Sequence, residues 1–523
     1  MKYFIIMFWF LPFLSIILSV HGEENLDPNP LVGDGIDAEE AKALRQSPFK
    51  LAISNSKTQG SITGVVEATE LDNVFYSFRG IRYASAERWK DPKVLLDDWT
   101  QLPNAQDGPA CPQEPKEGYI ISEENCLWLN VFTPELSELE NPSLEAKYDV
   151  ANGFLHEHKF SKHAVIVFLH PAGPHWDKGW AADEDYGPLH LLDYETLLVT
   201  VNYRIGEFGF GNGKNLGLKD QNAALKWVNK NIDRFGGDAN RVTIIGHGSG
   251  GAAAHFHLLS PMSAGLFKSA ISMSGSALNP WAFVPSSEWE NGKGRIGPTV
   301  DGEFLTGNPE ELIKSGRFQK DCQWIAGVVS EEGKLLATQT NMNGLESFLK
   351  SFGFKSSDFK DISNAYIKNK LGKVEDLISD VLYNIGMDRS MRLMAENSNR
   401  GIYAYKLHQP NITIPDIPLS HGDELPYLFP MTLADPLQKD DEDQVFRNIL
   451  LRMFSDFVRF GHPTANTWNR QHLHHSYWRH FKLNKPEYLD LKMNNIKMKE
   501  GMFRDRLEFW RKHLEEPKIK NEL

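Results

Sequence analysis

The sequence predicts an α/β protein, in which a mostly parallel central sheet is covered by helices on both faces. Residues 164–169 form a continuous apolar run, as a strand buried on both faces requires. Between residues 218 and 235 apolar side chains instead recur at helical spacing, and Gly236 and Gly237 end the predicted helix. Strand-like and helical segments that alternate in this way are typical of parallel sheets.

Further strands follow in chain order. They are expected at residues 197–203, 242–245, 270–273, 324–329 and 402–407. The run at 242–245 leads into a glycine-rich turn and then into an alanine-rich helix. This is the setting of a nucleophile elbow, a turn that needs small residues two positions before and after its apex. No repeat and no linker divides the body of the chain, so we expect residues 57–516 to form one domain.

The composition is that of a folded globular protein and argues against some classes of function. The 523 residues are 41% hydrophobic and 24% charged, with 69 acidic against 56 basic side chains and a net charge of −13. This balance disfavours binding to nucleic acid, because no basic face is evident that would neutralise phosphates. With only 3 cysteines, a large apolar core must supply the stability.

The N-terminus carries a targeting signal. Lys2 precedes an apolar run over residues 3–20 and small residues follow, which predicts a cleaved signal peptide at residues 1–22. An uncleaved membrane anchor is the alternative, but the run is barely long enough to span a bilayer and Pro12 interrupts it. No other segment is apolar enough to span a membrane after cleavage. Residues 23–56 are acidic and contain several prolines, so we expect a flexible arm there.

The C-terminus carries a second address. The sequence Lys-Asn-Glu-Leu at residues 520–523 differs by one residue from the Lys-Asp-Glu-Leu retrieval signal. We therefore expect the tail, residues 517–523, to hold the protein in the lumen of the endoplasmic reticulum, with secretion as the alternative. Both compartments are oxidising, so Cys111 and Cys126 can form a disulfide across a short loop. Asn411 begins the glycosylation sequon Asn-Ile-Thr.

Four motifs make the chain similar to the type-B carboxylesterase and cholinesterase family. They are Glu-Asn-Cys-Leu-Trp-Leu-Asn-Val at 124–131, Val-Thr-Val-Asn-Tyr-Arg at 199–204, Phe-Gly-Gly-Asp at 235–238 and Ser-Gly-Ser at 274–276. The similarity extends over roughly residues 57–515. It implies the α/β-hydrolase fold and a catalytic Ser, Glu and His in that order along the chain.

The resemblance also implies which residues stand at the catalytic positions. Residues 327–333 resemble the segment with the acid and place it on Glu332, while residues 420–425 place the base on His421. The family's Gly-Glu-Ser-Ala-Gly-Gly turn reads Gly-His-Gly-Ser-Gly-Gly here, so Gly248 stands where the nucleophilic serine is expected. Because glycine adopts the strained elbow backbone readily, we expect the turn to survive without its hydroxyl.

Ser249 is the alternative nucleophile, one position further along the chain. In that register the residue two positions earlier would be His247, whose side chain is too bulky for the elbow. We also expect the hydroxyl of Ser249 to point away from His421.

The family's oxyanion hole is altered as well. The sequence His-Pro-Ala-Gly-Pro at 170–174 stands where the family has a His-Gly-Gly-Gly run. Pro171 has no amide hydrogen, so the expected donors are the backbone amides of Ala172, Gly173 and Ser249. Ala172 is less free than glycine to adopt the required dihedrals. Pre-aimed donors contribute roughly 3 kcal/mol each to such chemistry, so their disturbance weakens it further.

We therefore expect a catalytically impaired carboxylesterase-like protein of the secretory pathway, which binds an unidentified protein partner or a small hydrophobic ligand. The alternative is an active serine carboxylesterase that uses Ser249 with His421 and Glu332. The retained acid and base favour this alternative, but they can also persist as a buried hydrogen-bonded pair. No cofactor or metal is expected, because a metal between His247 and His421 would need further ligands that the sequence does not identify.

Overall fold

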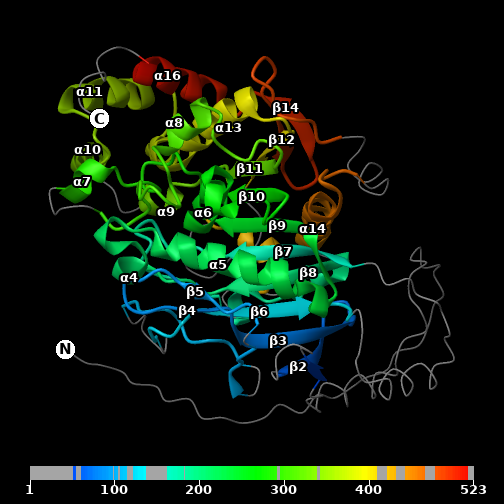
Figure 1. Cartoon of the computed structure of the whole chain (residues 1–523). Helices are drawn as coiled ribbons and strands as arrows, with labels where there is room; N and C mark the ends of the chain where they lie inside the picture. Colours follow the sequence, from blue (N-terminus) through cyan, green and yellow to red (C-terminus); the bar gives the residue numbers. More distant parts are fainter. Residues whose placement is uncertain are drawn as a thin grey trace, which may run out of the picture.

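The computed structural model describes most of the predicted domain (Figure 1). The predicted signal peptide, the predicted tail, Asn411 and nearly all of the predicted arm lie outside the described residues. The described residues are 51–54, 61–97, 99–103, 106–114, 122–136, 162–181, 183–290, 295–337, 342–408, 421–431, 442–465 and 477–515.

A sheet of 12 strands forms the centre of the described part of the chain (Figure 1). Its strand order is β1-β2-β3-β6-β8-β7-β9-β10-β11-β12-β13-β14. Adjacent strands from β8 across to β13 pair in parallel, whereas those at both edges pair antiparallel, which confirms the predicted sheet. The strands are β1 (Leu51–Ser54), β2 (Ser61–Ala68), β3 (Val74–Arg82), β6 (Trp128–Thr133), β7 (His163–Leu169), β8 (Thr196–Val201), β9 (Gly237–His247), β10 (Ser269–Met273), β11 (Gln323–Val329), β12 (Ile402–Leu407), β13 (Glu487–Leu491) and β14 (Lys497–Glu500), with β4 (Ala84–Ser85) and β5 (Lys93–Val94) in a second, small sheet.

Helices cover both faces of the sheet. Val165 and Val167 of β7 belong to an apolar core that α5 and α6 complete, whereas Ile166 and Phe168 belong to a core that contains side chains of α14. The continuous apolar run in β7 follows from this burial on both sides. The helices are α3 (Asp183–Tyr186), α4 (Gly206–Phe210), α5 (Leu216–Asn231), α6 (Ser249–Leu259), α7 (Ser286–Glu290), α8 (Pro309–Lys314), α9 (Lys334–Ala337), α10 (Met342–Ser351), α11 (Ser356–Ser363), α12 (Val374–Ser379), α13 (Ile385–Asn397), α14 (Glu442–Phe460) and α16 (Arg504–Glu515).

The predicted helix at 218–235 is two helices in sequence. It consists of α5 and a 3₁₀-helix, Ile232–Phe235, and Gly236 then ends it with a φ of 80°. Only glycine adopts such a left-handed conformation at no steric cost, which is why the glycine pair marks the boundary correctly. The predicted strands at 164–169, 270–273, 324–329 and 402–407 are confirmed as β7, β10, β11 and β12.

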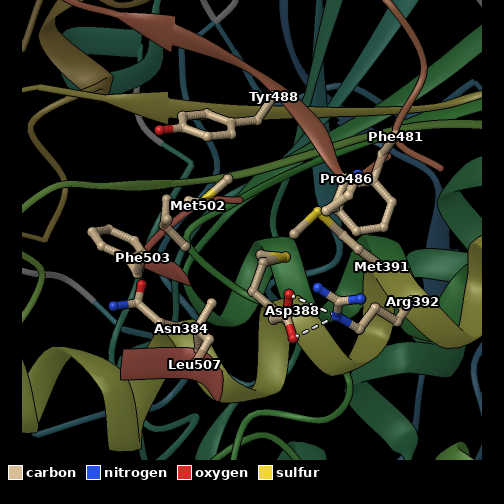
Figure 2. Close-up of a pocket in the computed structure, with 12 residues that line it drawn as sticks. Asn384, Asp388, Met391, Arg392, Phe481, Pro486, Tyr488, Met502, Phe503 and Leu507 are labelled. Atoms are coloured by element: carbon tan, nitrogen blue, oxygen red, sulfur yellow. Dashed lines mark hydrogen bonds and ion pairs between the residues drawn. The ribbon is translucent and has the colours of Figure 1, made fainter. Parts of the chain in front are cut away.

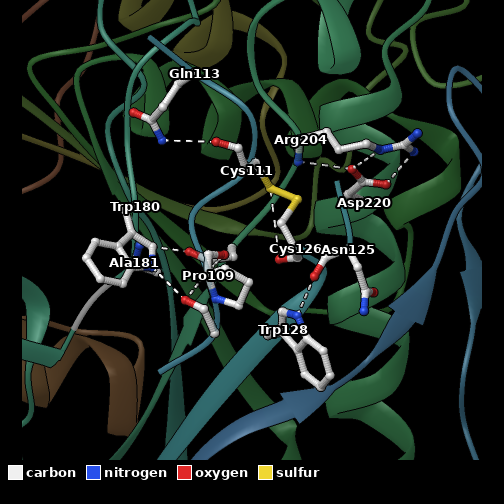
Figure 3. The surroundings of a disulfide bond; sticks show 12 residues. Pro109, Cys111, Gln113, Asn125, Cys126, Trp128, Trp180, Ala181, Arg204 and Asp220 are labelled. Carbon is white, nitrogen blue, oxygen red and sulfur yellow. Dashed lines mark hydrogen bonds and ion pairs between the residues drawn. A yellow bond between two sulfur atoms is a disulfide. The ribbon is translucent and has the colours of Figure 1, made fainter. Parts of the chain in front are cut away.

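The disulfide between Cys111 and Cys126 is present (Figure 3). Close to it, the side-chain amide of Gln113 exchanges two hydrogen bonds with the backbone of Gly179, at 2.9 and 3.1 Å. Gly179 in turn lies against the segment that follows β7, since a Cβ added there would come within 2.3 Å of the carbonyl oxygen of Pro171. Gln113, two positions after Cys111, therefore supports the segment in which the oxyanion amides are expected.

A buried ion pair lies in the same region (Figure 3). The guanidinium group of Arg204 donates two hydrogen bonds of 2.7 Å to the carboxylate of Asp220, and both side chains are buried.

Within the described ranges, none of the helices combines the length and the apolar character needed to cross a bilayer.

Candidate functional site

The turn between β9 and α6 has the geometry that its glycine-rich sequence predicts. Gly248 joins the two elements with φ of 55° and ψ of −120°, a conformation that L side chains rarely adopt. A Cβ on Gly246 would lie 2.2 Å from the carbonyl oxygen of Gly250, and one on Gly250 would lie 2.1 Å from that of Leu169. Only glycine fits two positions before and after Gly248, so Gly248 is the apex of the turn.

Glu332 and His421 meet at the same end of the sheet, although 89 positions separate them. Glu332 follows β11 in a turn, and its Oε1 accepts a hydrogen bond of 2.9 Å from the backbone amide of Val329. Its Oε2 lies 2.7 Å from Nδ1 of His421. In the tautomer whose Nδ1 donates to this carboxylate, Nε2 is the acceptor nitrogen of the ring.

That second nitrogen of His421 faces the apex of the turn. A Cβ on Gly248 would lie 3.0 Å from Nε2 of His421. The structure thus brings Gly248, Glu332 and His421 together, as their assignment to one site requires. With a serine at the apex, such a pair would remove its hydroxyl proton. Gly248 offers no hydroxyl to this base.

Two aromatic rings contact the imidazole of His421. Its ring centroid lies 4.4 Å from that of His247 and 4.4 Å from that of Tyr383. The sequence anticipates the approach of His247, but not that of Tyr383. Tyr383 lies in a π-helix, Asp380–Asn384, and no local motif marks this interruption of the helical period.

Ser249 is turned toward the segment after β7. Its Oγ accepts a hydrogen bond of 2.6 Å from the backbone amide of Ala172. Gly173 has a positive φ of 69°, whereas the φ of Ala172 is not positive. Ala172 therefore does not need the left-handed freedom of glycine. The structure brings Ser249 and Ala172 into direct contact, and the sequence does not predict this.

Two ionisable side chains close to the site, His247 and Glu424, are held in their uncharged forms. Burial and the proximity of His421 hold the pKa of His247 well below its usual value, so its ring is neutral. Burial, together with the charge of Glu332, raises the pKa of Glu424 to about 8. Oε1 of Glu424 accepts a hydrogen bond of 2.7 Å from Ser274 and lies 3.9 Å from Nε2 of His247. Glu424 is therefore largely protonated at neutral pH.

Comparison with known proteins now identifies the family. The model of the carboxylesterase family matches residues 51–295 and 289–510. The chain belongs to the carboxylesterase family. A carboxylic ester hydrolase of Bombus ignitus is 25% identical, over 86% of this chain and 92% of its own. The juvenile hormone esterase of Tribolium castaneum is 27% identical, over 87% and 92% of the two chains, and esterase E4 of Myzus persicae is 28% identical, over 77% and 85%.

In the ranges that the structure describes, no three or more His, Cys, Asp or Glu side chains are grouped so that they could hold a metal ion. A pocket of about 340 Å³, including space open to solvent, lies elsewhere and is lined by none of the predicted site residues (Figure 2). It contains the ion pair between Asp388 and Arg392, at 2.9 Å, and three methionines, Met387, Met391 and Met502.

The buried Glu424 predicts how stability depends on pH. Its carboxyl group has a higher pKa in the folded chain than the ordinary 4.5, so folding binds a proton and the free energy of unfolding falls as pH rises from 4.5 to about 8. Glu424→Gln keeps an acceptor for Ser274 and removes this titration. We expect the variant to gain at least about 1 kcal/mol relative to the wild type between pH 5 and pH 8.5, measured by urea denaturation.

The control is Glu508→Gln on α16, whose partner Lys512 lowers the pKa of Glu508. Because Glu508 titrates below this pH range, the free energy of unfolding of Glu508→Gln should change with pH in the same way as that of the wild type. Parallel profiles for Glu424→Gln as well would contradict the raised pKa of Glu424.

Proposed function

We propose that this member of the carboxylesterase family is catalytically impaired, and that it acts in the secretory pathway by binding a protein or a small hydrophobic ligand. One observation carries the proposal: the apex that faces Nε2 of His421 is Gly248. Loss of a triad nucleophile typically lowers turnover about a millionfold. The relatives named as esterases support the fold and the location of the site, while the chemistry depends on this residue.

An active carboxylesterase that uses Ser249 is the second candidate. The preserved hydrogen bond between Glu332 and His421 favours it, because that pair is what a serine nucleophile would need. Two observations weigh against it. The hydroxyl of Ser249 is bonded to the amide of Ala172, and the residue two positions earlier is His247 rather than a small residue.

Labelling of the purified mature protein with a fluorophosphonate probe tests the proposal, with Ser249→Ala as its matched control. We expect no labelling of either protein, and hydrolysis of p-nitrophenyl acetate no more than about 10³–10⁴-fold above water, the level that binding and oxyanion contacts alone sustain. Labelling that disappears in Ser249→Ala would establish the second candidate. Labelling that persists there would show a nucleophile at another position.

The proposed compartment is the lumen of the endoplasmic reticulum, with secretion as the alternative. The Lys-Asn-Glu-Leu sequence at residues 520–523 supports this proposal. The disulfide between Cys111 and Cys126 is compatible with it, because such bonds persist in oxidising compartments.

A further inference from the structure

We propose that the hydroxyl of Ser249 occupies the acceptor position at the Ala172 amide in the oxyanion site of this chain, so that this amide is closed to a substrate oxygen independently of the residue at position 248. The inference rests on the proposed function only in taking Gly248 as the apex of the elbow. It adds a second obstacle to ester hydrolysis, which a change at the apex alone does not remove.

The position of the oxyanion site follows from the fold. In an elbow of this type, the stabilising amides come from the residue after the apex and from the segment after a neighbouring strand. Here these are the amide of Ser249, at the start of α6, and the segment that contains Ala172, after β7. Strands β7 and β9 are adjacent and parallel, so their carboxyl ends bring both amides to the same edge of the sheet.

The amide of Ala172 already has a partner within the chain. It donates to Oγ of Ser249 over 2.6 Å, and both residues are buried, at 0% and 3% exposure. A substrate oxygen that used this amide would have to sit within about 3 Å of the same nitrogen, where Oγ now lies. Two oxygen atoms cannot occupy that position together, so a substrate oxygen can use the Ala172 amide only if the Ser249 hydroxyl rotates away from it.

The hydroxyl also stabilises the fold at this point. A buried amide without a partner is unfavourable, and the Ser249 side chain satisfies one without any ligand. Alanine, which the family resemblance places at this position, has no atom that could do so. The chain therefore combines a glycine at the apex with a hydroxyl that fills the neighbouring acceptor position. Any ligand at this site has to bind without a hydrogen bond to the Ala172 amide.

Restoring the apex hydroxyl in two backgrounds tests the inference. We compare Gly248→Ser with the double variant Gly248→Ser/Ser249→Ala, and follow the rate of fluorophosphonate labelling and the hydrolysis of p-nitrophenyl butyrate. One oxyanion donor contributes about 10²–10³ to turnover, so we expect the double variant to react about a hundredfold faster than the single one. Equal rates in both variants would overturn the inference.

The matched control is Ser390→Ala in the Gly248→Ser background. Ser390 is as buried as Ser249, but its hydroxyl bonds to Ser276 rather than to the oxyanion segment. Its removal should leave the rate of Gly248→Ser unchanged. A gain in this control equal to that of Ser249→Ala would show a general loosening of the core and would also overturn the inference.

A second measurement needs no catalysis. In the otherwise unchanged chain, Ser249→Ala removes the acceptor of the Ala172 amide, and deuterium exchange at this amide should become about fivefold faster or more, whereas Ser390→Ala should not alter it. Unchanged exchange in Ser249→Ala would overturn the inference even if no variant hydrolyses esters. Labelling of the wild type would instead overturn the proposed function and leave the exchange result standing, so the two failures are distinguishable.

Discussion

Asp220→Ala is expected to lower the free energy of unfolding by about 3–5 kcal/mol. The substitution removes the carboxylate that accepts two hydrogen bonds from the Arg204 guanidinium, and Arg204 is only 4% exposed. The guanidinium would keep its bond to the carbonyl oxygen of Lys90 but would lose its hydrogen-bonded counter-ion while it remains buried. Urea denaturation at pH 7, followed by tryptophan fluorescence, measures the loss.

A double variant separates the cost of leaving one buried charge unpaired from the net contribution of the ion pair to stability. Burial raises the pKa of Asp220 in spite of the neighbouring Arg204, so the charged form of this carboxyl group is costly to bury. Arg204→Met/Asp220→Leu removes both, so it should be less destabilised than Asp220→Ala. Glu500→Ala, which breaks an exposed pair with Arg504, should cause no measurable change. A loss in Asp220→Ala as small as in Glu500→Ala would contradict the assigned role.

Deletion of residues 520–523 is expected to move most of the protein from the cells to the medium. The expectation rests on the proposed retrieval role of the Lys-Asn-Glu-Leu sequence at residues 520–523. Immunoblots of cell lysate and medium, with the full-length chain expressed in parallel, measure the distribution.

The control keeps residues 520–523 but places one further residue after them. One alanine added after Leu523 retains all four residues while displacing the terminal carboxylate, so it should be secreted like the deletion. If the distribution of both forms equals that of the unaltered chain, the tail is not a retrieval signal. If the unaltered chain is already secreted, secretion replaces the proposed compartment.

The local sequence was sufficient to predict those strands that are buried on both faces of the sheet. β7 and β11 are buried along nearly their whole lengths, so their apolar runs are continuous and easily recognised, and in β12 only Lys406 interrupts the run. The antiparallel strands toward the two edges of the sheet are harder to predict from the sequence. In β3 buried and partly exposed residues interchange, and β14 is mostly exposed, so neither has a pronounced apolar run. Their existence depends on pairing with neighbours rather than on their own composition.

The amino-acid sequence shows which chemical groups stand at the site: a glycine at position 248, a carboxyl group at 332, an imidazole at 421 and a serine at 249. Its glycine spacing also determined the apex, because Gly246 and Gly250 leave no room for a Cβ. The resemblance to a known family then indicated that Glu332 and His421 form one site.

Which of these groups touch one another depends on the folded chain. The bond between Ala172 and Ser249 joins residues 77 positions apart, and the stacking of Tyr383 on His421 depends on a π-helix. Hydrogen bonds act over about 3 Å and depend on side-chain direction, whereas a sequence pattern records only residue type and spacing. The chain alone therefore shows which hydroxyl is missing from the apex, and its folded packing shows where the neighbouring hydroxyl is bound.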